Sequence, residues 1–265
     1  TLAISFMACA ELPAVIVNVM RPGPGDGEIT AAQGDYFQAV KGAGHGDYNL
    51  IVLAPFSGQE TVDLTAEAFD LAEKYRNPVM ILSDAMLAKM MESVQLPDYQ
   101  DNKKEFNWTL TGAAGRAPNA ITTCGTGPEQ FEKVVMHLQE KYKAVAEKEQ
   151  RWESYLTEDA ELIIVAFGIV SRIALSVIKK ARANGLKVGM VRPITLWPFP
   201  NNAFTELKNR EYLVVELNAG QMVEDVKLAV DNKDRVNFYG RLGGMTPTPN
   251  EIYDKVVEIY KAQDN

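Results

Sequence analysis

The feature that most constrains the fold is a regular alternation of short apolar runs with longer amphipathic segments. In the second half of the chain the apolar runs predict four strands, at residues 161–166, 187–192, 211–217 and 236–240. The amphipathic segments between and after them predict helices at residues 170–181, 222–230 and 249–262. Strands that alternate with helices predict a parallel sheet with right-handed crossovers. We therefore expect residues 159–265 to form a complete α/β domain.

The first half has the same character but offers fewer strands. Buried strands are expected at Ala14–Val19, Asn49–Pro55 and Val79–Leu82, and Asn119–Thr123 is a short candidate for a fourth. Helices are expected at residues 1–12, at residues 29–42, and from a capping box at Ser57 and Glu60 to the break at Asn77-Pro78. Ser83 and Asp84, directly after the third strand, are expected to cap the element that follows. The apolar residues 1–12 would be a buried element at a chain terminus, which is unusual. We therefore expect residues 1–127 to be the C-terminal part of a truncated parallel-sheet domain.

The connection between the two units is expected to be a charged helix. Residues 129–156 place apolar side chains on one stripe, and we assign residues 128–158 to this connecting helix. Before it, residues 97–128 have little apolar periodicity and form a long surface excursion, of a length that is usually functional or interfacial. Residues 193–200, with Trp197 and Phe199, are interpreted as a packed crossover, with an inter-subunit contact as the alternative.

A strand that runs into a glycine and proline loop is the best candidate for a ligand site. Residues 14–19 are apolar or β-branched apart from Asn18, as in a central strand that is covered on both faces. The loop that follows contains Pro22 and Pro24, which end the strand, and three glycines that permit positive φ, namely Gly23, Gly25 and Gly27. Ligands of open α/β sheets bind where strands end in such loops. We therefore expect Arg21–Gly27 to be the active loop.

Arg21 is the candidate binding residue of this loop. A guanidinium at a strand end suits a bidentate grip on a carboxylate or phosphate, and the alternative is an ion pair with an acid such as Asp26. The run Gly25-Asp26-Gly27 begins like a thiamine diphosphate motif, but it has no asparagine at the required spacing, so we interpret it as a turn. One aspartate without a neighbouring acid makes a poor magnesium site, and the GxxxxGK[ST] phosphate loop is absent from the sequence.

His45 is the second candidate. It lies in the glycine-rich segment GAGHGDY beside Asp47, where an imidazole could act as an acid, a base or a substrate donor. A structural or interfacial role is favoured, because no nucleophile lies near it in the sequence and the motif GxSxG of serine hydrolases is absent. The other histidine, His137, is expected on the surface of the charged helix.

Composition excludes several classes of protein. The net charge of −8 argues against nucleic acid or an anionic membrane as the main partner. No apolar run approaches the roughly 20 residues of a membrane span, and no secretory signal opens the chain, so a cytoplasmic location is expected. Cys9 and Cys124 lie far apart without a CxxC pair, which argues against iron–sulfur or zinc ligation within this chain. Both are expected to be buried thiols.

Three stretches together resemble a known family. The runs SFMACAELPAVIVNVMRPGPGDGEITAAQGDYFQAVKGAGHGDYNLIVLAP and SGQETVDLTAEAFDLAEKYRNPVMILSD, at residues 5–55 and 57–84, resemble the alpha subunit of the 2-oxoacid:ferredoxin oxidoreductases. The closest resemblance is to the 2-ketoisovalerate (3-methyl-2-oxobutanoate) branch. The run VRPITLWPFP at residues 191–200 resembles the second-domain signature of the same subunit.

The resemblance implies a subunit of a larger enzyme. Such enzymes oxidatively decarboxylate a 2-oxoacid with coenzyme A and thiamine diphosphate, and pass the electrons through iron–sulfur clusters to ferredoxin. Their alpha subunit supplies a pyrimidine-type thiamine diphosphate domain and a transketolase C-terminal-like domain. The diphosphate and Mg²⁺ motif lies on a beta subunit, and the cluster cysteines lie largely on a ferredoxin-like subunit. We therefore expect cofactor and Mg²⁺ to be shared with the beta subunit, and no cluster in this chain.

The resemblance also implies roles for residues of the loop. Arg21 matches an arginine that faces the substrate carboxylate, and Gly23, Gly25 and Gly27 match the turn over which cofactor and partner close. The family's subunit begins upstream of Thr1, with a glutamate that activates the cofactor and a threonine near the substrate. A 2-oxoglutarate-specific member, a non-catalytic assembly module and a separate enzyme that binds a phosphorylated ligand remain as alternatives.

Overall fold

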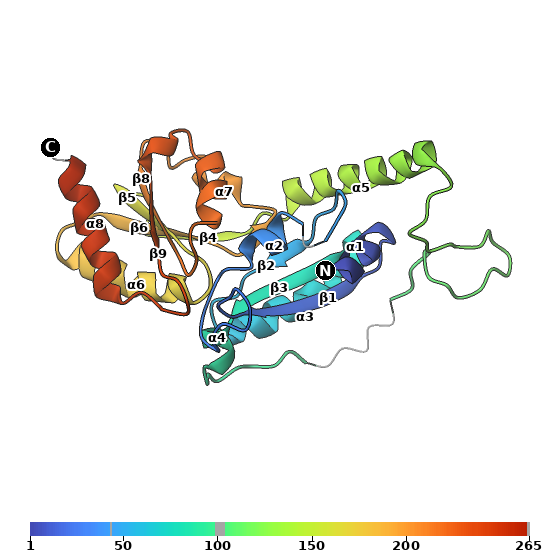
Figure 1. Cartoon of the computed structure of the whole chain (residues 1–265), viewed down its shortest axis with the longest axis horizontal. Helices are drawn as coiled ribbons and strands as arrows, with labels where there is room; N and C mark the ends of the chain where they lie inside the picture. Colours follow the sequence, from blue (N-terminus) through green and yellow to red (C-terminus); the bar gives the residue numbers. More distant parts are fainter. Residues whose placement is uncertain (43, 99–103, 264–265) are drawn as a thin grey trace.

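The protein consists of two β-sheets that lie side by side, each covered by helices (Figure 1). The structure is a computed structural model that describes residues 1–42, 44–98 and 104–263. The strand order is β1-β3-β2-β7 in the first sheet and β4-β6-β5-β8-β9 in the second. One cluster of buried side chains extends from the first sheet, through Met20 and Tyr36, to the second, through Phe167 and Val214. The predicted α/β class is therefore confirmed, and the two halves share part of their core.

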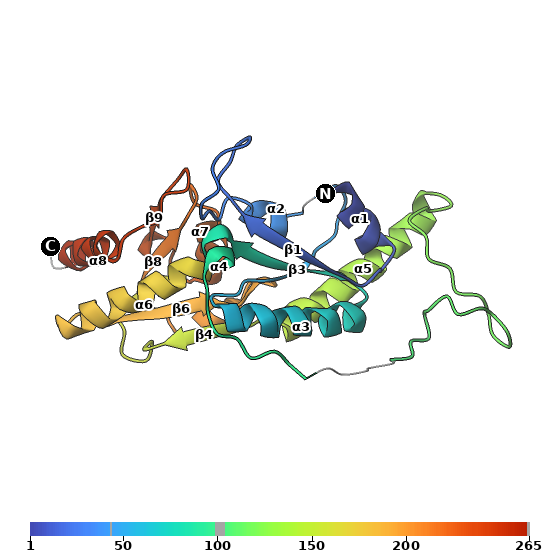
Figure 2. The same cartoon turned by 90° about the horizontal axis from the view of Figure 1, so that it is seen from below.

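The first sheet contains the three predicted strands, β1 (Ala14–Met20), β2 (Ile51–Leu53) and β3 (Pro78–Asp84), all parallel. Helix α3 (Gly58–Tyr75) covers one face, and the short α2 (Tyr36–Val40) lies on the other (Figure 2). The long α5 (Pro128–Lys148) contributes Leu138 and Tyr142 to the cluster on the α2 face and Val145 to the cluster under α3. The remaining helices of this half are α1 (Leu2–Cys9) and α4 (Ala85–Lys89).

The N-termini of α3 and α4 have the predicted caps. The hydroxyl of Ser57 accepts a hydrogen bond from the Glu60 N–H at 3.1 Å, so the capping box is confirmed, and the Glu60 carboxylate reaches back to the N–H of Phe56 at 2.8 Å. Asp84 caps α4, as its place after a strand suggests. Because these caps depend on residues close in sequence, their local pattern is sufficient to predict them.

Two predictions for the first sheet are wrong. Strand β1 is at the edge of the sheet and not at its centre, and the side chains of Val17 and Val19 are 59% and 43% exposed. Residues 119–123 form no strand; the fourth strand is β7 (Thr195–Trp197), which pairs antiparallel with β2. A run of β-branched residues favours an extended backbone, but contacts far along the chain decide which strands become neighbours. Residues 193–200 thus lead from β6 of the second sheet into the first sheet, where Thr195–Trp197 pair with β2, and this agrees with a packed crossover.

Two predicted helices are shorter than expected. Of residues 29–42 only α2 is helical, because the preceding residues make hydrogen bonds to the second half of the protein. The helix predicted at residues 129–156 occupies residues 128–148. Residues Trp152–Tyr155 form β4, which pairs antiparallel with β6. Residues 90–98 and 104–127 contain no helix or strand, in agreement with the predicted excursion, of which residues 99–103 lie outside the described residues.

The second sheet confirms its four predicted strands, which are parallel to one another: β5 (Leu162–Val165), β6 (Val188–Pro193), β8 (Glu211–Glu216) and β9 (Val236–Gly240). Helices α6 (Gly168–Ala183) and α8 (Pro249–Gln263) pack on one face, and α7 (Met222–Ala229) on the other (Figure 1). Two 3₁₀ helices complete the half, η1 (Asn201–Phe204) and η2 (Lys233–Arg235).

The expectation of two buried thiols is wrong. Cys9 is partly buried on α1, and Cys124 is exposed on the excursion before α5. Both belong to segments that lie at the periphery of the first sheet, where the apolar sequence around Cys9 is only partly covered: Leu2 and Phe6 on the same helix are exposed. Burial of a cysteine is a tendency of the residue type, and its element decides the outcome.

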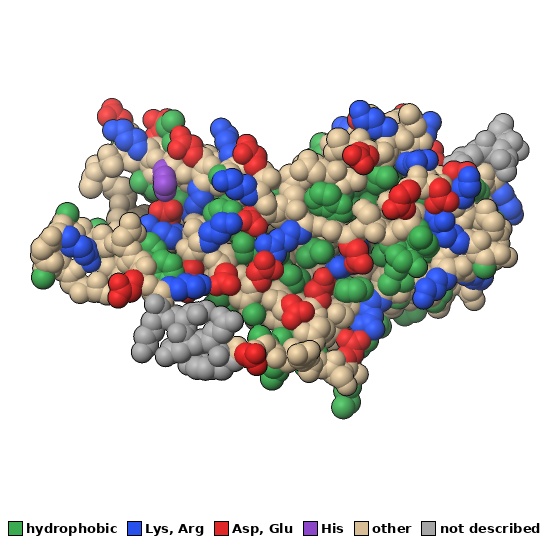
Figure 3. Space-filling view, turned by 180° about the vertical axis from the view of Figure 1, so that it is seen from behind, with side chains coloured by type: hydrophobic (Ala, Val, Ile, Leu, Met, Phe, Trp, Pro, Cys, Tyr) green, Lys and Arg blue, Asp and Glu red, His purple; other side chains and the backbone are tan. Residues whose placement is uncertain are grey.

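No helix among the described residues is long and apolar enough to cross a bilayer. On the face shown in Figure 3, acidic and basic side chains alternate over both halves, with small apolar patches between them. An interspersed pattern of this kind is typical of a surface that is not dominated by one sign of charge.

A buried ion-pair cluster joins the two halves. The guanidinium of Arg192 on β6 is 3% exposed, and it donates to both carboxylate oxygens of Glu60 on α3, at 3.0 and 2.9 Å. It also donates to Glu153 on β4 at 2.9 Å and lies over the ring of Phe56. Such bidentate geometry fixes the second sheet against the start of α3.

We expect Arg192→Ala to lower the free energy of unfolding by about 3 kcal/mol, because it leaves the largely buried Glu60 carboxylate without its cation. Urea unfolding followed by circular dichroism measures the loss. Lys187→Ala is the control, since Lys187 pairs with Glu161 at the surface, where an ion pair contributes little. Equal losses in the two variants would contradict a role for Arg192 in joining the halves.

Candidate functional site

Arg21 lies at the carboxyl end of β1, where an open α/β sheet places its ligands. It follows Met20 directly, and Met20 is the register partner of Asp84 at the end of β3. The side chain of Arg21 is exposed, and one of its guanidinium nitrogens donates to the backbone oxygen of Asp26. The acceptor is a carbonyl and not the carboxylate of Asp26. The positive charge of Arg21 is therefore not neutralised within this contact.

Two of the three glycines are needed for the shape of the loop. Gly27 has a φ of +51°, and a Cβ at that position would lie 1.7 Å from the carbonyl oxygen of Pro22. The loop therefore closes on itself only because residue 27 has no side chain. Gly25 also has a positive φ, +70°, but a Cβ there would meet nothing within 4 Å. Gly23 does not adopt positive φ.

The second half of the protein supports the outer side of the same loop. Gly244, which follows β9, approaches so closely that a Cβ would lie 1.9 Å from the hydroxyl oxygen of Thr30 and 3.1 Å from Pro22. On the other side, the ammonium of Lys89, at the end of α4, donates to the carbonyl of Ile29 at 2.6 Å. Residues from both halves thus hold the loop that carries Arg21.

Gln33 fixes the chain where it leaves the loop. Its side chain is fully buried, donates to the carbonyl of Phe167 at 2.9 Å and accepts from the N–H of Leu217 at 3.0 Å. Its own N–H donates to the Leu217 carbonyl at 3.0 Å, and its carbonyl accepts from the Asn218 amide at 2.8 Å. The N–H and C=O of the Gln33 backbone and the nitrogen and oxygen of its side-chain amide therefore all have hydrogen-bond partners in the second half.

Asp84 is a buried carboxylate that connects the two halves. One oxygen caps α4 by accepting from the N–H groups of Met86 and Leu87, at 2.9 and 3.1 Å. The other accepts from the N–H of Ile169, at the start of α6, at 3.2 Å. Burial raises the pKa of Asp84, and these three backbone hydrogen bonds oppose that shift by stabilising the charged form.

His45 lies far from this loop, at the amino-terminal side of the sheet. It precedes β2 along the chain, whereas Arg21 follows β1, and the two strands run parallel. The carbonyl of His45 accepts from the hydroxyl of Ser5 on α1 at 2.6 Å, and the imidazole is exposed. The structure does not bring the two candidate residues together.

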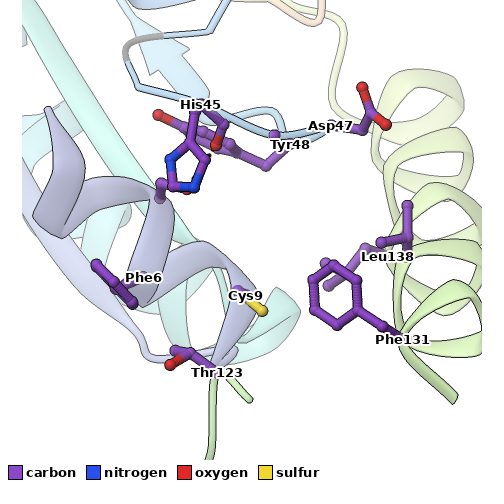
Figure 4. A pocket seen from close by; sticks show the side chains of 11 residues that line it. Phe6, Cys9, His45, Asp47, Tyr48, Thr123, Phe131 and Leu138 are labelled. Atoms are coloured by element: carbon purple, nitrogen blue, oxygen red, sulfur yellow. Dashed lines mark hydrogen bonds between the residues drawn. The ribbon is translucent and has the colours of Figure 1, made fainter. Parts of the chain in front are cut away.

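His45 borders a cavity of about 210 Å³ between α1, α5 and the loop before β2 (Figure 4). The rings of Phe6 and Phe131 and the side chain of Leu138 make it largely apolar, and the thiol of Cys9 lies between them. Burial is the main cause that raises the pKa of Cys9, which keeps the thiol protonated and weakens it as a nucleophile.

The described residues offer no metal centre. Nowhere in 1–42, 44–98 and 104–263 do three or more His, Cys, Asp or Glu side chains converge on a point that would suit a metal ion. A thiamine diphosphate held against the Arg21 loop would therefore find no cluster of metal ligands among these residues. The open space beside Gly25 fits such an approach, because no side chain fills it.

Three residues that hold the loop are not recognisable as such from the sequence: Gln33, Asp84 and Gly244. The sequence identifies Asp84 only as a helix cap. Gln33 occupies a segment predicted to be helical, and Gly244 lies in an ordinary glycine turn before α8. The partners of Gln33 and Asp84 in the second half are more than 80 residues away in the chain, so no local pattern identifies them.

Two family models match adjacent parts of the chain. Residues 2–156 match the model described as pyruvate flavodoxin/ferredoxin oxidoreductase, thiamine diphosphate-binding. Residues 160–252 match the model described as pyruvate:ferredoxin oxidoreductase core domain II. Together the two models cover most of both halves.

Curated relatives and a solved structure agree with these models. A ketoisovalerate oxidoreductase subunit VorB from Methanothermobacter marburgensis is 48% identical over 97% of this chain and 73% of that protein. A 2-oxoglutarate synthase subunit KorA from the same organism is 33% identical over 96% of this chain and 76% of that protein. The 2-oxoglutarate:ferredoxin oxidoreductase of Magnetococcus marinus matches 97% of this chain with a TM-score of 0.79 and 26% identity, and this chain spans half of that one. The chain therefore belongs to the family of 2-oxoacid:ferredoxin oxidoreductase subunits.

Proposed function

We propose that this chain is the alpha subunit of a CoA-dependent enzyme that oxidatively decarboxylates a branched-chain 2-oxoacid to an acyl-CoA and CO₂, with ferredoxin as the electron acceptor. The observation that carries the proposal is the exposed, positively charged Arg21 at the carboxyl end of β1, on a loop that both halves hold in place. A 2-oxoacid presents a carboxylate, which a guanidinium binds through two parallel hydrogen bonds.

The proposed substrate class rests on the relatives. The protein named as a ketoisovalerate oxidoreductase subunit is 48% identical to this chain, and the one named as a 2-oxoglutarate synthase subunit is 33% identical. 3-Methyl-2-oxobutanoate is therefore the favoured substrate. A preference for 2-oxoglutarate is the alternative within the family, and it would require a further cation for the second carboxylate.

In this proposal Arg21 holds and orients the substrate carboxylate before it is lost as CO₂. Gly27 allows the loop that carries Arg21 to close against the Pro22 carbonyl, and Gly25 leaves the backbone accessible to a cofactor or a partner subunit. Bound thiamine diphosphate would supply the carbon nucleophile for the 2-oxo group. The geometry of this chain contributes orientation, since a substrate that is held at its carboxylate loses little further freedom on reaction.

The remaining parts of the enzyme are proposed to lie on partners. A beta subunit would hold Mg²⁺ and the diphosphate, and a ferredoxin-like subunit would hold the iron–sulfur clusters that reduce ferredoxin. The proposal includes a cytoplasmic location and the division into residues 1–127, 128–158 and 159–265. His45 borders a cavity at the opposite end of the sheet, and we assign it no step in the reaction.

The test is an activity measurement on the assembled complex. The chain is produced anaerobically with its partner subunits, and CoA-dependent reduction of a viologen dye is measured with 3-methyl-2-oxobutanoate, 2-oxoglutarate and pyruvate. We expect kcat/KM for 3-methyl-2-oxobutanoate to exceed that for 2-oxoglutarate by roughly tenfold or more, as pockets for apolar side chains allow.

Other outcomes select the other functions. A preference for 2-oxoglutarate would contradict the branched-chain assignment and keep the family's reaction. No turnover of any 2-oxoacid by a complex that is verified to hold its cofactor and clusters would contradict the enzyme, and would leave a module for assembly. Binding of a phosphorylated ligand by the isolated chain would favour a separate enzyme that acts without partner subunits.

A further inference from the structure

The second sheet has the crevice in which doubly wound folds bind ligands. Strand β5 lies between β6 and β8, and the chain passes first to β6 and then across to β8. The strand order therefore reverses between β5 and β8. Ligands bind outside the carboxyl ends of two such strands. The helices that follow, α6 and α7, direct their N-terminal N–H groups toward that point, where anions are favoured.

In this protein, groups of the chain itself occupy the crevice. The Asp84 carboxylate takes the position of an anion at the start of α6, through its hydrogen bond from Ile169. A Cβ added to Gly168, the first residue of α6, would lie 3.2 Å from Asp84 and 3.3 Å from the side-chain nitrogen of Gln33. The space beside this helix end is therefore full.

The start of α7 is occupied in the same way. The fully buried carboxylate of Glu216, the last residue of β8, accepts from the N–H groups of Met222 and Val223 at 2.9 and 3.0 Å. Between the two helix ends, the amide of Gln33 connects the carbonyl of Phe167, which follows β5, to the N–H of Leu217, which follows β8. One side chain from the first half thus bridges both strands of the crevice.

Two of these filling groups border the Arg21 loop. Asp84 is the register partner of Met20, immediately before Arg21, and Gln33 is the point at which the chain after the loop becomes fixed. The two ends of the loop from Arg21 to Ala32 are therefore fixed by Asp84 and Gln33, and both of these side chains lie in the crevice of the second sheet. A shift of either side chain moves the ends of the loop.

We propose that Gln33 and Asp84 are positioning residues for Arg21, and that the ligand crevice of the second sheet serves as the docking site of the substrate-binding loop. The inference rests on the proposed role of Arg21 in binding the 2-oxoacid carboxylate. It assigns the second sheet a part in substrate binding without any ligand of its own.

Gln33→Glu tests this inference in the assembled complex. When ionised, the introduced carboxylate would face the Phe167 carbonyl, which offers no proton, whereas the protonated carboxyl group would donate to that carbonyl as the amide does. We expect KM for 3-methyl-2-oxobutanoate to rise about tenfold at pH 8 with kcat little changed, since the lost interaction is substrate binding. We expect KM to return toward the value of the unmodified enzyme as the pH falls and the carboxyl group becomes protonated.

The matched control is Gln150→Glu. Gln150 makes the same two kinds of contact, donating to the carbonyl of Ala146 and accepting from the N–H of Asn202, but it lies away from the loop. A purely structural defect removes active complex, and so lowers the maximal rate at constant KM. We therefore expect KM of the Gln150→Glu complex to equal that of the unmodified complex at every pH.

Each outcome is decisive. A KM for Gln33→Glu that equals that of the unmodified complex at all pH values would overturn the inference. If Arg21→Ala also leaves KM unchanged, the proposed role of Arg21 fails instead, and the two failures are thereby distinguished. If Gln33→Glu does not assemble, Asp84→Asn replaces it: the amide keeps one acceptor oxygen, and an unchanged KM in that variant would overturn the inference equally.

Discussion

Replacing Arg21 with alanine lowers kcat/KM for the 2-oxoacid about 100-fold in the assembled complex, mainly through a higher KM. The substitution removes charge-assisted hydrogen bonds to the substrate carboxylate, and a loss of about 3 kcal/mol corresponds to that factor. Arg21→Lys keeps the charge but not the planar pair of donors, so it should recover only part of the loss. Steady-state viologen reduction at varied 2-oxoacid concentration measures both effects.

Arg116→Ala is the matched control for this substitution. Arg116 is also exposed, and its guanidinium donates to the backbone carbonyls of Ala117 and Thr109, much as that of Arg21 donates to Asp26. It lies on the excursion before α5, away from the carboxyl ends of the strands. Equal kinetic effects in the Arg21 and Arg116 variants would remove Arg21 from the site.

Gly27→Ala should have an effect of similar size by a different route. The added methyl group would overlap the Pro22 carbonyl at 1.7 Å, and the nearest atoms are all backbone atoms of Pro22 and Gly23, so no side chain can move aside to make room. The loop must therefore open, and Arg21 moves with it. A displacement of about 1 Å in a positioning group can cost roughly 100-fold in rate, and we expect kcat/KM to fall by that order.

Gly25→Ala separates this steric effect from backbone strain. Gly25 also has a positive φ, and alanine there carries a conformational cost of about 1–2 kcal/mol, but the methyl group meets open space. We expect a fall of less than about tenfold in kcat/KM, with melting temperatures close to each other in the two variants because the loop is exposed. If the two substitutions reduce kcat/KM equally, closure of the loop around residue 27 does not position Arg21.

The strands were predictable because their signal is local. Runs of apolar and β-branched residues between turn formers identified the four parallel strands of the second sheet and the three parallel strands of the first. The caps at Ser57 and Asp84 were predictable for the same reason.

The neighbours of each strand were not predictable. Strand β1 has the sequence of a buried strand and lies at an edge, and β7 joins the first sheet from residues that follow the second sheet's β6. Trp152–Tyr155 continue a helical pattern but form β4, because pairing with β6 stabilises them more than a further turn of α5 would. Such pairings depend on contacts between distant parts of the chain, which override local propensity.

The same distinction applies to the site. Arg21 and its glycines are conspicuous in the sequence, because a cation after a strand and among turn formers has few structural explanations. Gln33 and Asp84 are conspicuous only in the structure, where their polar atoms meet groups of the second sheet. His45 had a suggestive sequence context, and the parallel direction of β1 and β2 puts it at the other end of the sheet.

The most direct test of the role of Arg21 is the position of the substrate carboxylate in a structure of the assembled complex with 3-methyl-2-oxobutanoate bound. We expect both carboxylate oxygens to lie about 2.7–2.9 Å from nitrogens of the Arg21 guanidinium, with Gln33 still bridging Phe167 and Leu217. A carboxylate bound by other groups, with Arg21 still turned toward the Asp26 carbonyl, would contradict that role.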